Sequence, residues 1–300
     1  MDQKIPRLID TGSGSSTIYY KNRYLYSSRS PREGAERRAK RLTLEPQTLY
    51  IVPSPLLLYG IDVLLSKLPD TAHILAVEVD QYLMRLVNES PLYSVLHNKQ
   101  ISIIRSESPA DICSFLYGID IGQYRRCRMI TLNGGYSLYP EIYRTLFQAV
   151  EQEIQSFWQN KATLMQMGPL WIRNLFKNLK ENSPFQDISS LQTDKPVVIA
   201  GAGESLEDSI PAIKRRRDAI FLLSVDTALP ALYGNGIVPD LVCALDAQHI
   251  NTGDFQRTVG ENIPIAFDLT SSPVAPRLLS GKRYVFLSYL TKIKSNSYDQ

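Results

Sequence analysis

Residues 197–209, VVIAGAGESLEDS, combine an apolar run, two glycines separated by one residue, and a serine that enters an acidic, helix-like stretch. A strand, a glycine turn and a helix start in this order form a common phosphate-binding unit. A dinucleotide fingerprint would need a third glycine where Leu206 stands, and a P-loop would need a Gly-Lys-Ser/Thr that this stretch lacks. The stretch therefore predicts a strand–turn–helix unit whose ligand must be inferred from the rest of the chain.

The chain around this stretch alternates between apolar runs and helix-like segments. Helices are predicted over about 205–217 and over 227–236. The predicted strands of this part are 196–201, 219–226, 241–246, 263–269 and 283–289. Such alternation is typical of a parallel α/β sheet with crossover connections. Five strands without a terminal helix predict a thin domain, which is either compact or the front part of a longer protein.

The N-terminal part of the chain shows the same alternation. Residues 17–30 alternate aromatic and polar side chains and predict a hairpin or edge strands, and a helix follows from Pro31. The predicted strands here are 48–52, 73–79, 101–104 and 128–133. This pattern predicts a second parallel α/β sheet.

A helical segment separates the two α/β parts. Residues 139–160 predict a long amphipathic helix, and residues 167–182 predict a second helical piece. We therefore predict an N-terminal Rossmann-like domain over 1–138, a helical linker over 139–190, and a second Rossmann-like domain over 191–300.

Composition narrows the class of protein. The net charge of +3 is too small to argue for nucleic acid or a membrane surface as a partner. Three scattered cysteines without CxxC spacing indicate thiols in a reducing compartment. No signal peptide and no apolar run of about 20 residues is visible, so we expect a cytoplasmic protein.

The glycine turn is the first part of the predicted site. In an open parallel sheet, ligands bind where the carboxyl ends of strands meet helix starts. Gly201 and Gly203 would permit positive φ and close backbone approach, and the helix start at Ser205 would offer unpaired N–H groups to an anion. A Gly-x-Gly after a strand is also often only a tight turn.

Carboxylates at the neighbouring strand ends form the second part. Asp226 ends the second strand, Asp246 the third, and Asp268 falls near the end of the fourth. Carboxylates in such places bind ribose hydroxyls, hold Mg²⁺ or act as bases. Asp226 also fits a structural role as the cap of the helix that follows, so Asp246 is the first catalytic candidate. His249 is a candidate substrate ligand because it follows Asp246, although isolated histidines are more often structural.

A family resemblance joins these features. GAGESL, VDTALPAL and NGIVPDLVCALDAQ, in this order, resemble the central domain shared by Maf (motility accessory factor) proteins and MptE-like 6-hydroxymethylpterin pyrophosphokinases. The matching positions are Gly201, Gly203, Ser205, Leu206, Asp226, Ala228, Leu229, Gly236, Ile237, Pro239, Asp240 and Asp246. One departure is Glu204, where the family usually has proline; a carboxylate there would oppose phosphate binding.

The resemblance extends upstream. SSRSPREGAERRA is similar to the segment that opens Maf-type N-terminal domains, and WIRNLFKNL to their linker helix, with Asn174 and Asn178 in matching places. It implies a fold similar to bacterial sialyltransferases, and a transferase that places a nucleotide-activated nonulosonic sugar on flagellin without a resident metal. Asn174 is carried over as a substrate-binding candidate.

Two other functions stay open. The MptE-like branch implies a pyrophosphokinase that uses ATP with Mg²⁺, and the departure at Glu204 leaves room for a non-catalytic motility accessory protein. In the first domain, Pro53 and Pro55 stand where nucleotide- or methyl-donor-binding folds have glycines. Glu78 ends the second strand where a ribose-binding acid would stand, but without the glycine turn we expect a scaffold rather than a methyltransferase.

Overall fold

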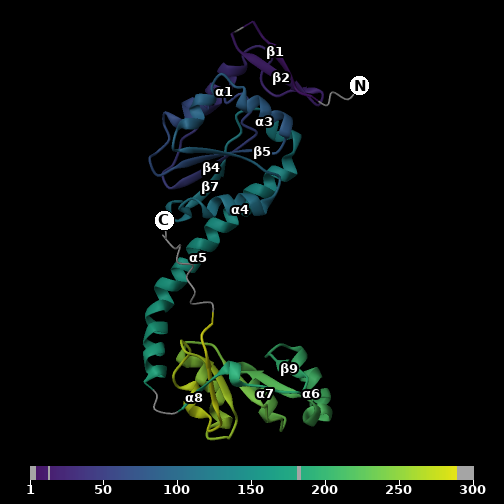
Figure 1. Ribbon diagram of the computed structural model, residues 1–300, viewed down its shortest axis with the longest axis vertical. Helices are drawn as coiled ribbons and strands as arrows, with labels where there is room; N and C mark the ends of the chain where they lie inside the picture. The colour runs from purple at the N-terminus through teal and green to yellow at the C-terminus, as the bar shows by residue number, and fades with distance from the viewer. Residues whose placement is uncertain (1–4, 13, 181–183, 289–300) are drawn as a thin grey trace. The chain divides into compact units, whose positions relative to one another are not determined.

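The computed structural model describes residues 5–12, 14–180 and 184–288, with the side chains of 249–252 excepted. The chain forms two compact units, Met1–Ala162 and Thr163–Gln300. Each contains a parallel sheet with helices, as Figure 1 shows. The predicted α/β class with two Rossmann-like sheets is confirmed.

The first unit is built on a four-stranded parallel sheet in the order β6-β5-β4-β7. Its strands are β4 (Thr48–Pro53), β5 (His73–Glu78), β6 (Ile101–Arg105) and β7 (Arg126–Met129). Its helices are α1 (Pro31–Arg41), α2 (Ile61–Leu65), α3 (Gln81–Asn88) and α4 (Pro109–Tyr117), with 3₁₀ turns η1 (Tyr93–His97), η2 (Ile121–Gln123) and η3 (Gly135–Leu138). Successive side chains of a strand point to opposite faces, and β4 contributes to a separate buried cluster on each face.

An antiparallel hairpin sheet precedes this core. It consists of β1 (Arg7–Asp10), β2 (Ser16–Tyr20) and β3 (Arg23–Tyr24), in that order. The turn between β2 and β3 has positive φ at both Lys21 (45°) and Asn22 (62°), as a two-residue type I′ hairpin turn requires. The predicted hairpin therefore forms, and its turn fixes the position of Lys21.

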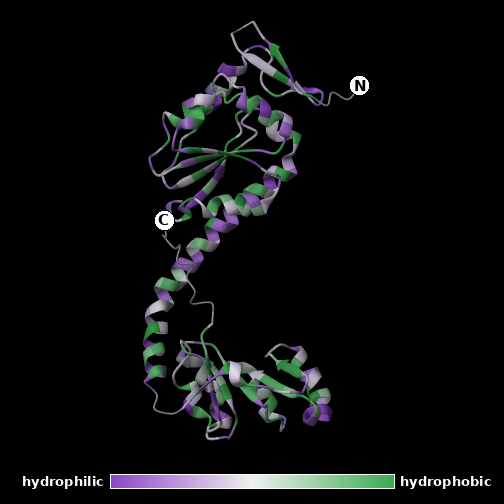
Figure 2. Cartoon of the chain, in the orientation of Figure 1, coloured by the Kyte–Doolittle hydropathy of each residue, from purple (hydrophilic) through white to green (hydrophobic). Residues whose placement is uncertain are grey.

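The two helical pieces predicted over 139–182 are one helix, α5 (Pro140–Leu179), which alternates hydrophobic and hydrophilic residues in Figure 2. The gap left between the two predicted pieces, residues 161–166, is helical, and Pro169 also lies inside the helix. Proline removes a single helical N–H donor. The helix continues past it because both flanks are held by packing: Leu146 and Val150 are buried in the first unit, and Asn174 is buried in the second.

The second unit is built on a six-stranded parallel sheet in the order β8-β13-β12-β11-β10-β9. The strands are β8 (Gln186–Asp187), β9 (Val197–Ala200), β10 (Phe221–Val225), β11 (Leu241–Ala244), β12 (Ile265–Asp268) and β13 (Arg283–Phe286). The helices are α6 (Ser205–Arg216), α7 (Leu229–Gly234) and α8 (Ala275–Leu278), with η4 (Ile188–Ser190), η5 (Arg217–Ala219), η6 (Asp226–Ala228) and η7 (His249–Thr258). Five of the six strands were predicted; β8 was not, because two polar residues carry no strand pattern.

The strands β9 to β12 place the turns of the predicted site side by side. Each strand pairs in parallel with the next along the chain, with Ala200 opposite Ser224 and Val225 opposite Cys243. The carboxyl ends of β9, β10 and β11 therefore meet at one edge of the sheet.

Candidate functional site

The turn between β9 and α6 is open to solvent. Gly201 and Gly203 are exposed, and a Cβ added to either would meet no other atom within 4 Å. Neither glycine has positive φ, so the positive φ that glycine permits is not used at this turn. Neither conformation nor packing against the described residues requires glycine here. What the two glycines provide is unobstructed access to the backbone.

The start of α6 offers hydrogen-bond donors at this turn. Ser205 is the first helical residue, and the side chain of Glu204, at the N-cap position, makes no capping hydrogen bond. The N–H of Leu206 donates to the carbonyl of Gly203 at 3.0 Å. The N–H groups of a first helical turn lack helical partners and carry the positive end of the helix dipole. Glu207 and Asp208 lie in the same turn and add negative charge. The φ of Glu204, −53°, is one that proline adopts, so the family's usual residue would fit.

Three carboxylates come together beside the turn. Asp226 is half-buried, and its Oδ1 accepts a hydrogen bond of 2.9 Å from the N–H of Thr227. Burial raises the pKa of Asp226, and the negative charges of Asp254 and Asp246 raise it further. Asp226 begins η6 rather than standing before it, so it does not occupy the expected cap position. Its position instead places its charge within range of two other acids.

Asp246 is the exposed member of this group. It lies two residues beyond β11, and its Oδ1 accepts a hydrogen bond of 2.8 Å from the N–H of Gln248. Its own carbonyl accepts one of 2.8 Å from the N–H of Ser272. The loops after β11 and β12 are thereby tied together next to an accessible carboxylate.

Two members of the site were not predicted. Asp254 lies in η7, a 3₁₀ segment that packs against η6 and α7. Cys243 lies in β11, and burial raises the pKa of its thiol, with further contributions from Asp226 and Asp268. Asp254 lies 28 residues beyond Asp226 in an irregular segment, and no sequence spacing predicts that the two are close. The packing of η7 places it near Asp226.

Asp268 is at the end of β12, as predicted, but it is fully buried. Its Oδ1 accepts hydrogen bonds from the N–H (2.7 Å) and hydroxyl (2.6 Å) of Thr270, and its Oδ2 accepts one from the N–H of Ser288 (2.6 Å). Burial opposes ionisation, but these hydrogen bonds outweigh it and lower the pKa. This geometry supports a role in positioning loops in place of the expected substrate contact.

Asn174 forms hydrogen bonds with the backbone of the loops after β11 and β12. Its Nδ2 donates to the carbonyls of Ala247 (3.0 Å) and Thr270 (3.2 Å), and it is buried. Asn178, one helical turn later, donates to the carbonyls of Leu269 (2.9 Å) and Ser271 (3.1 Å). The amide of Asn174 thus holds the backbone beside Asp246 rather than projecting into open space. The side chain of His249 lies outside the described part of the chain.

The turn after β4 in the first unit is closed, in contrast to the turn after β9. Leu56, Leu57 and Leu58 follow β4 and are all buried in its core. Glu78 is 0% exposed, and its oxygens accept hydrogen bonds from the Ser54 hydroxyl (2.8 Å) and the Tyr143 hydroxyl (3.1 Å) and from two backbone N–H groups. Burial raises its pKa to about 7. A buried, fully bonded carboxyl has no free oxygen for a ribose.

The described residues contain neither a ready-made metal site nor a membrane-crossing helix. No group of three or more His, Cys, Asp or Glu side chains is placed to hold a metal ion within residues 5–12, 14–180 and 184–288. Although α5 is 40 residues long, neither it nor any other helix of the described chain has the apolar length needed to cross a bilayer.

Residues 171–300 match the family described as 6-hydroxymethylpterin diphosphokinase MptE-like. The match lies within the second unit. The structure is also similar to that of the MAf glycosyltransferase from Magnetospirillum magneticum AMB-1, with a TM-score of 0.64 and 17% identity over 95% of this chain and 52% of that one. At this identity the similarity shows a shared fold. The predicted Maf/MptE-like assignment is confirmed.

Two curated relatives come from Treponema pallidum (strain Nichols), and both are uncharacterized proteins. One is 30% identical over 290 residues, which cover 95% of this chain and 50% of the relative. The other is 25% identical over 178 residues, 56% of this chain and 85% of the relative. The chain thus spans about half the length of the first relative and of the solved glycosyltransferase.

Proposed function

We propose that the chain is a transferase whose second unit binds a nucleotide-activated sugar at the carboxyl edge of its sheet. The observation that carries the proposal is the joint placement of an open glycine turn after β9, a helix start without a side-chain cap, and the carboxylates of Asp226 and Asp246 after β10 and β11, with Asp254 of η7 close enough to Asp226 to affect its charge. The MptE-like match and the fold shared with a glycosyltransferase support it.

Each part of the site has a role in this proposal. The N–H groups of the first turn of α6 bind the phosphate of the nucleotide, and Gly201 and Gly203 let it approach the backbone. Asp246, exposed and held by Gln248, accepts a proton from the attacking hydroxyl or binds a sugar hydroxyl. Asp226 holds a proton more readily than an ordinary carboxyl, because of burial and of its two acidic neighbours. By family analogy the sugar is nonulosonic and the acceptor is flagellin, in a cytoplasmic reaction.

The alternative is transfer of pyrophosphate from ATP to a pterin alcohol, which the description of the matching family favours. That reaction would use Mg²⁺, and the described residues supply no ready-made set of three ligands for it. A third alternative is a non-catalytic motility accessory protein, which the acidic residues Glu204, Glu207 and Asp208 around the anion-binding turn favour.

The glycine turn offers the sharpest test. Because a Cβ at Gly203 meets no protein atom, Gly203→Ala should leave the melting temperature unchanged and lower nucleotide affinity about tenfold, by blocking close approach. Gly168→Ala is the matched control, since a Cβ there also meets nothing. Calorimetric titration with CMP, UDP and ATP, with and without Mg²⁺, gives the affinities.

The outcomes separate the three functions. Metal-independent binding of CMP or UDP that Gly203→Ala weakens supports the sugar transferase. Binding of ATP alone, and only with Mg²⁺, supports the kinase. Absence of binding, or binding that Gly203→Ala leaves unchanged, would contradict the proposed site.

Asp246→Asn and Asp226→Asn test the carboxylates. Asp246 is exposed, so Asp246→Asn should keep the melting temperature and lower turnover at least about 100-fold, the lower range for loss of a general base. Asp226→Asn removes the repulsion from Asp254 and Asp246 and should keep or raise the melting temperature. If Asp246→Asn unfolds the protein and leaves turnover intact, Asp246 is structural.

A further inference from the structure

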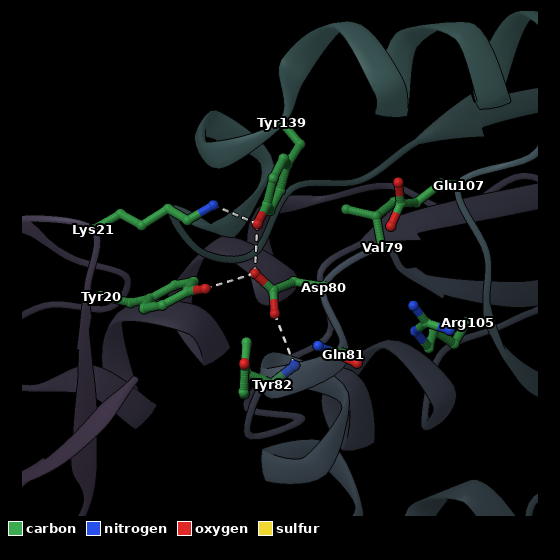
Figure 3. A pocket seen from close by; sticks show the side chains of 9 residues that line it. All are labelled: Tyr20, Lys21, Val79, Asp80, Gln81, Tyr82, Arg105, Glu107 and Tyr139. Atoms are coloured by element: carbon green, nitrogen blue, oxygen red, sulfur yellow. Dashed lines mark hydrogen bonds between the residues drawn. The ribbon is translucent and has the colours of Figure 1, made fainter. Parts of the chain in front are cut away.

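The first unit contains a cavity of about 440 Å³, separate from the site described above. Its walls come from the β2–β3 hairpin, from the residues after β5, from the end of β6 and from the residue before α5, as Figure 3 shows. The side chains that matter here are Tyr20, Lys21, Asp80, Tyr82, Arg105 and Tyr139. The volume lies in the range of small-molecule sites, and the carboxyl ends of parallel strands are where such sites form.

Asp80 organises one wall of this cavity. Its Oδ1 accepts hydrogen bonds from the N–H groups of Tyr82 (2.8 Å) and Leu83 (3.4 Å) and so caps α3. Its Oδ2 accepts hydrogen bonds from the hydroxyls of Tyr20 (2.9 Å) and Tyr139. Burial opposes ionisation of Asp80, but these hydrogen bonds outweigh it and lower the pKa. The carboxylate is satisfied by the protein, so it is a scaffold and not the ligand-binding group.

Lys21 is held over this wall. Because Tyr139 donates its proton to Asp80, its oxygen is free to accept a hydrogen bond from the Lys21 ammonium, at 2.5 Å. The ammonium also lies 4.2 Å from the centroid of the Tyr139 ring and 5.3 Å from that of Tyr20. These contacts use one of its three donors in a hydrogen bond, and the positive charge stays at the cavity.

Arg105 supplies a second cation from another element. It is the last residue of β6, is exposed, and forms no ion pair or side-chain hydrogen bond with the described part of the chain. Figure 3 shows Lys21 and Arg105 on opposite sides of Asp80. Glu107 lines the same cavity without forming an ion pair to Arg105 within 4 Å among the described residues. An unpaired guanidinium facing a cavity is a ready partner for an oxyanion.

We propose that this cavity binds the phosphate ester of a pentose, either a free sugar phosphate or a nucleotide. The phosphate bonds to the guanidinium of Arg105, the sugar hydroxyls bond to Gln81 and Glu107, and Tyr82 offers a ring face to the remainder. Lys21, on the other side of Asp80, adds positive charge to the cavity. The leucines after β4 fill the place where a dinucleotide phosphate would enter, so the ligand occupies the β5–β6 side of the edge only. This inference does not depend on the function proposed for the second unit.

The test is calorimetric titration of the full chain with ribose 5-phosphate, AMP and inorganic phosphate. Loss of a charge-assisted hydrogen bond should lower affinity about 10- to 100-fold, so Arg105→Gln should weaken binding of the sugar phosphates by that factor. Lys21→Gln removes a charge from the other side of Asp80 and should weaken binding less than Arg105→Gln does. The control is Lys99→Gln, which removes an exposed charge just before the opposite end of β6 and should change affinity less than twofold. Gly203→Ala should have no effect, which separates this site from that of the second unit.

AMP that binds more tightly than ribose 5-phosphate identifies a nucleotide site, and equal affinities identify a sugar phosphate site. The proposal is overturned if neither sugar phosphate binds below about 1 mM, if inorganic phosphate binds as tightly as both, or if Arg105→Gln leaves binding intact. Because Arg105 has no bonded partner among the described residues, that variant should keep the wild-type melting temperature.

Discussion

The two parallel sheets of this protein differ in how the chain visits their strands. In the first unit the chain passes from β4 to β5 and β6 and then returns to place β7 on the other side of β4. In the second unit each strand from β9 to β13 lies beside the one before it. Since crossover connections are right-handed, a sheet of the first kind receives connections on both faces and one of the second kind receives them on a single face.

The two sheets also differ in how fully their faces are buried. In the first unit, neighbouring residues of β4 enter two separate buried clusters, one on each face. In the second, α6 and α7 cover one face, and the other is covered at β11 to β13 by Ile188 and Leu191. At the edge strand β9, Val197 and Ile199 are 54% and 69% exposed. The first sheet is enclosed and the second is open at β9, where the glycine turn lies.

The largest expected effect concerns the sealed turn of the first unit. Leu57→Ala should lower the free energy of unfolding by about 2–5 kcal/mol, the usual cost of a cavity in a packed core. Leu8→Ala, at a half-exposed leucine of β1, should cost less than about 1 kcal/mol. Urea denaturation measures both. Equal effects would show that the turn after β4 is not part of the core.

Glu78 should make the free energy of unfolding depend on pH, by about 3 kcal/mol. Its pKa is about 7 in the folded protein against an ordinary value of 4.5, so the native state keeps a proton that the unfolded chain loses. The stabilisation from this retained proton is fully present below pH 4.5, and it is lost as pH rises to 7. Glu78→Gln should remove this dependence and be more stable than wild type at pH 8. Parallel stability–pH curves for the two proteins would contradict the assignment.

The smallest effect is expected at the open edge. Ile199→Thr should lower the free energy of unfolding by no more than about 0.5 kcal/mol, because the side chain is exposed and threonine keeps strand propensity. Ile51→Thr, in the enclosed sheet, buries a hydroxyl and should cost about 1–3 kcal/mol. A large cost for Ile199→Thr would mean that this face is covered in solution.

The parts of the fold that could be predicted are those that depend on local pattern. Apolar runs located the strands of both sheets, since a strand buried on its faces reads as a continuous apolar segment. The helix α5 was predicted as two pieces, 139–160 and 167–182, because local pattern does not register the tertiary packing that holds both ends of one continuous helix. The strand β8 was missed because it consists of Gln186 and Asp187, whose pairing depends on β13.

The site was predictable in its location and less so in its roles. Strand-end position identified Asp226 and Asp246, but burial and hydrogen bonding decide that Asp268 positions a loop. Asp254 lies near Asp226 because η7 packs there, and no hydrophobic periodicity in the sequence predicts that packing. Sequence alone does not distinguish a glycine that leaves room for a ligand from a glycine that needs positive φ. The conformation of Gly203 could therefore not be predicted.

The pair Asn174 and Asn178 gives the C-terminal half of α5 a mechanical role. Four carbonyls, from the loops after β11 and β12, are fastened to two amides spaced one turn apart on one side of this helix. The amide of Asn174 reaches the carbonyl of Ala247, the residue next to Asp246. A rotation of this half-helix about its axis must either break all four bonds or carry both loops with it. A rotation of this half of the helix that keeps the four bonds would therefore shift the backbone beside the exposed carboxylate of Asp246.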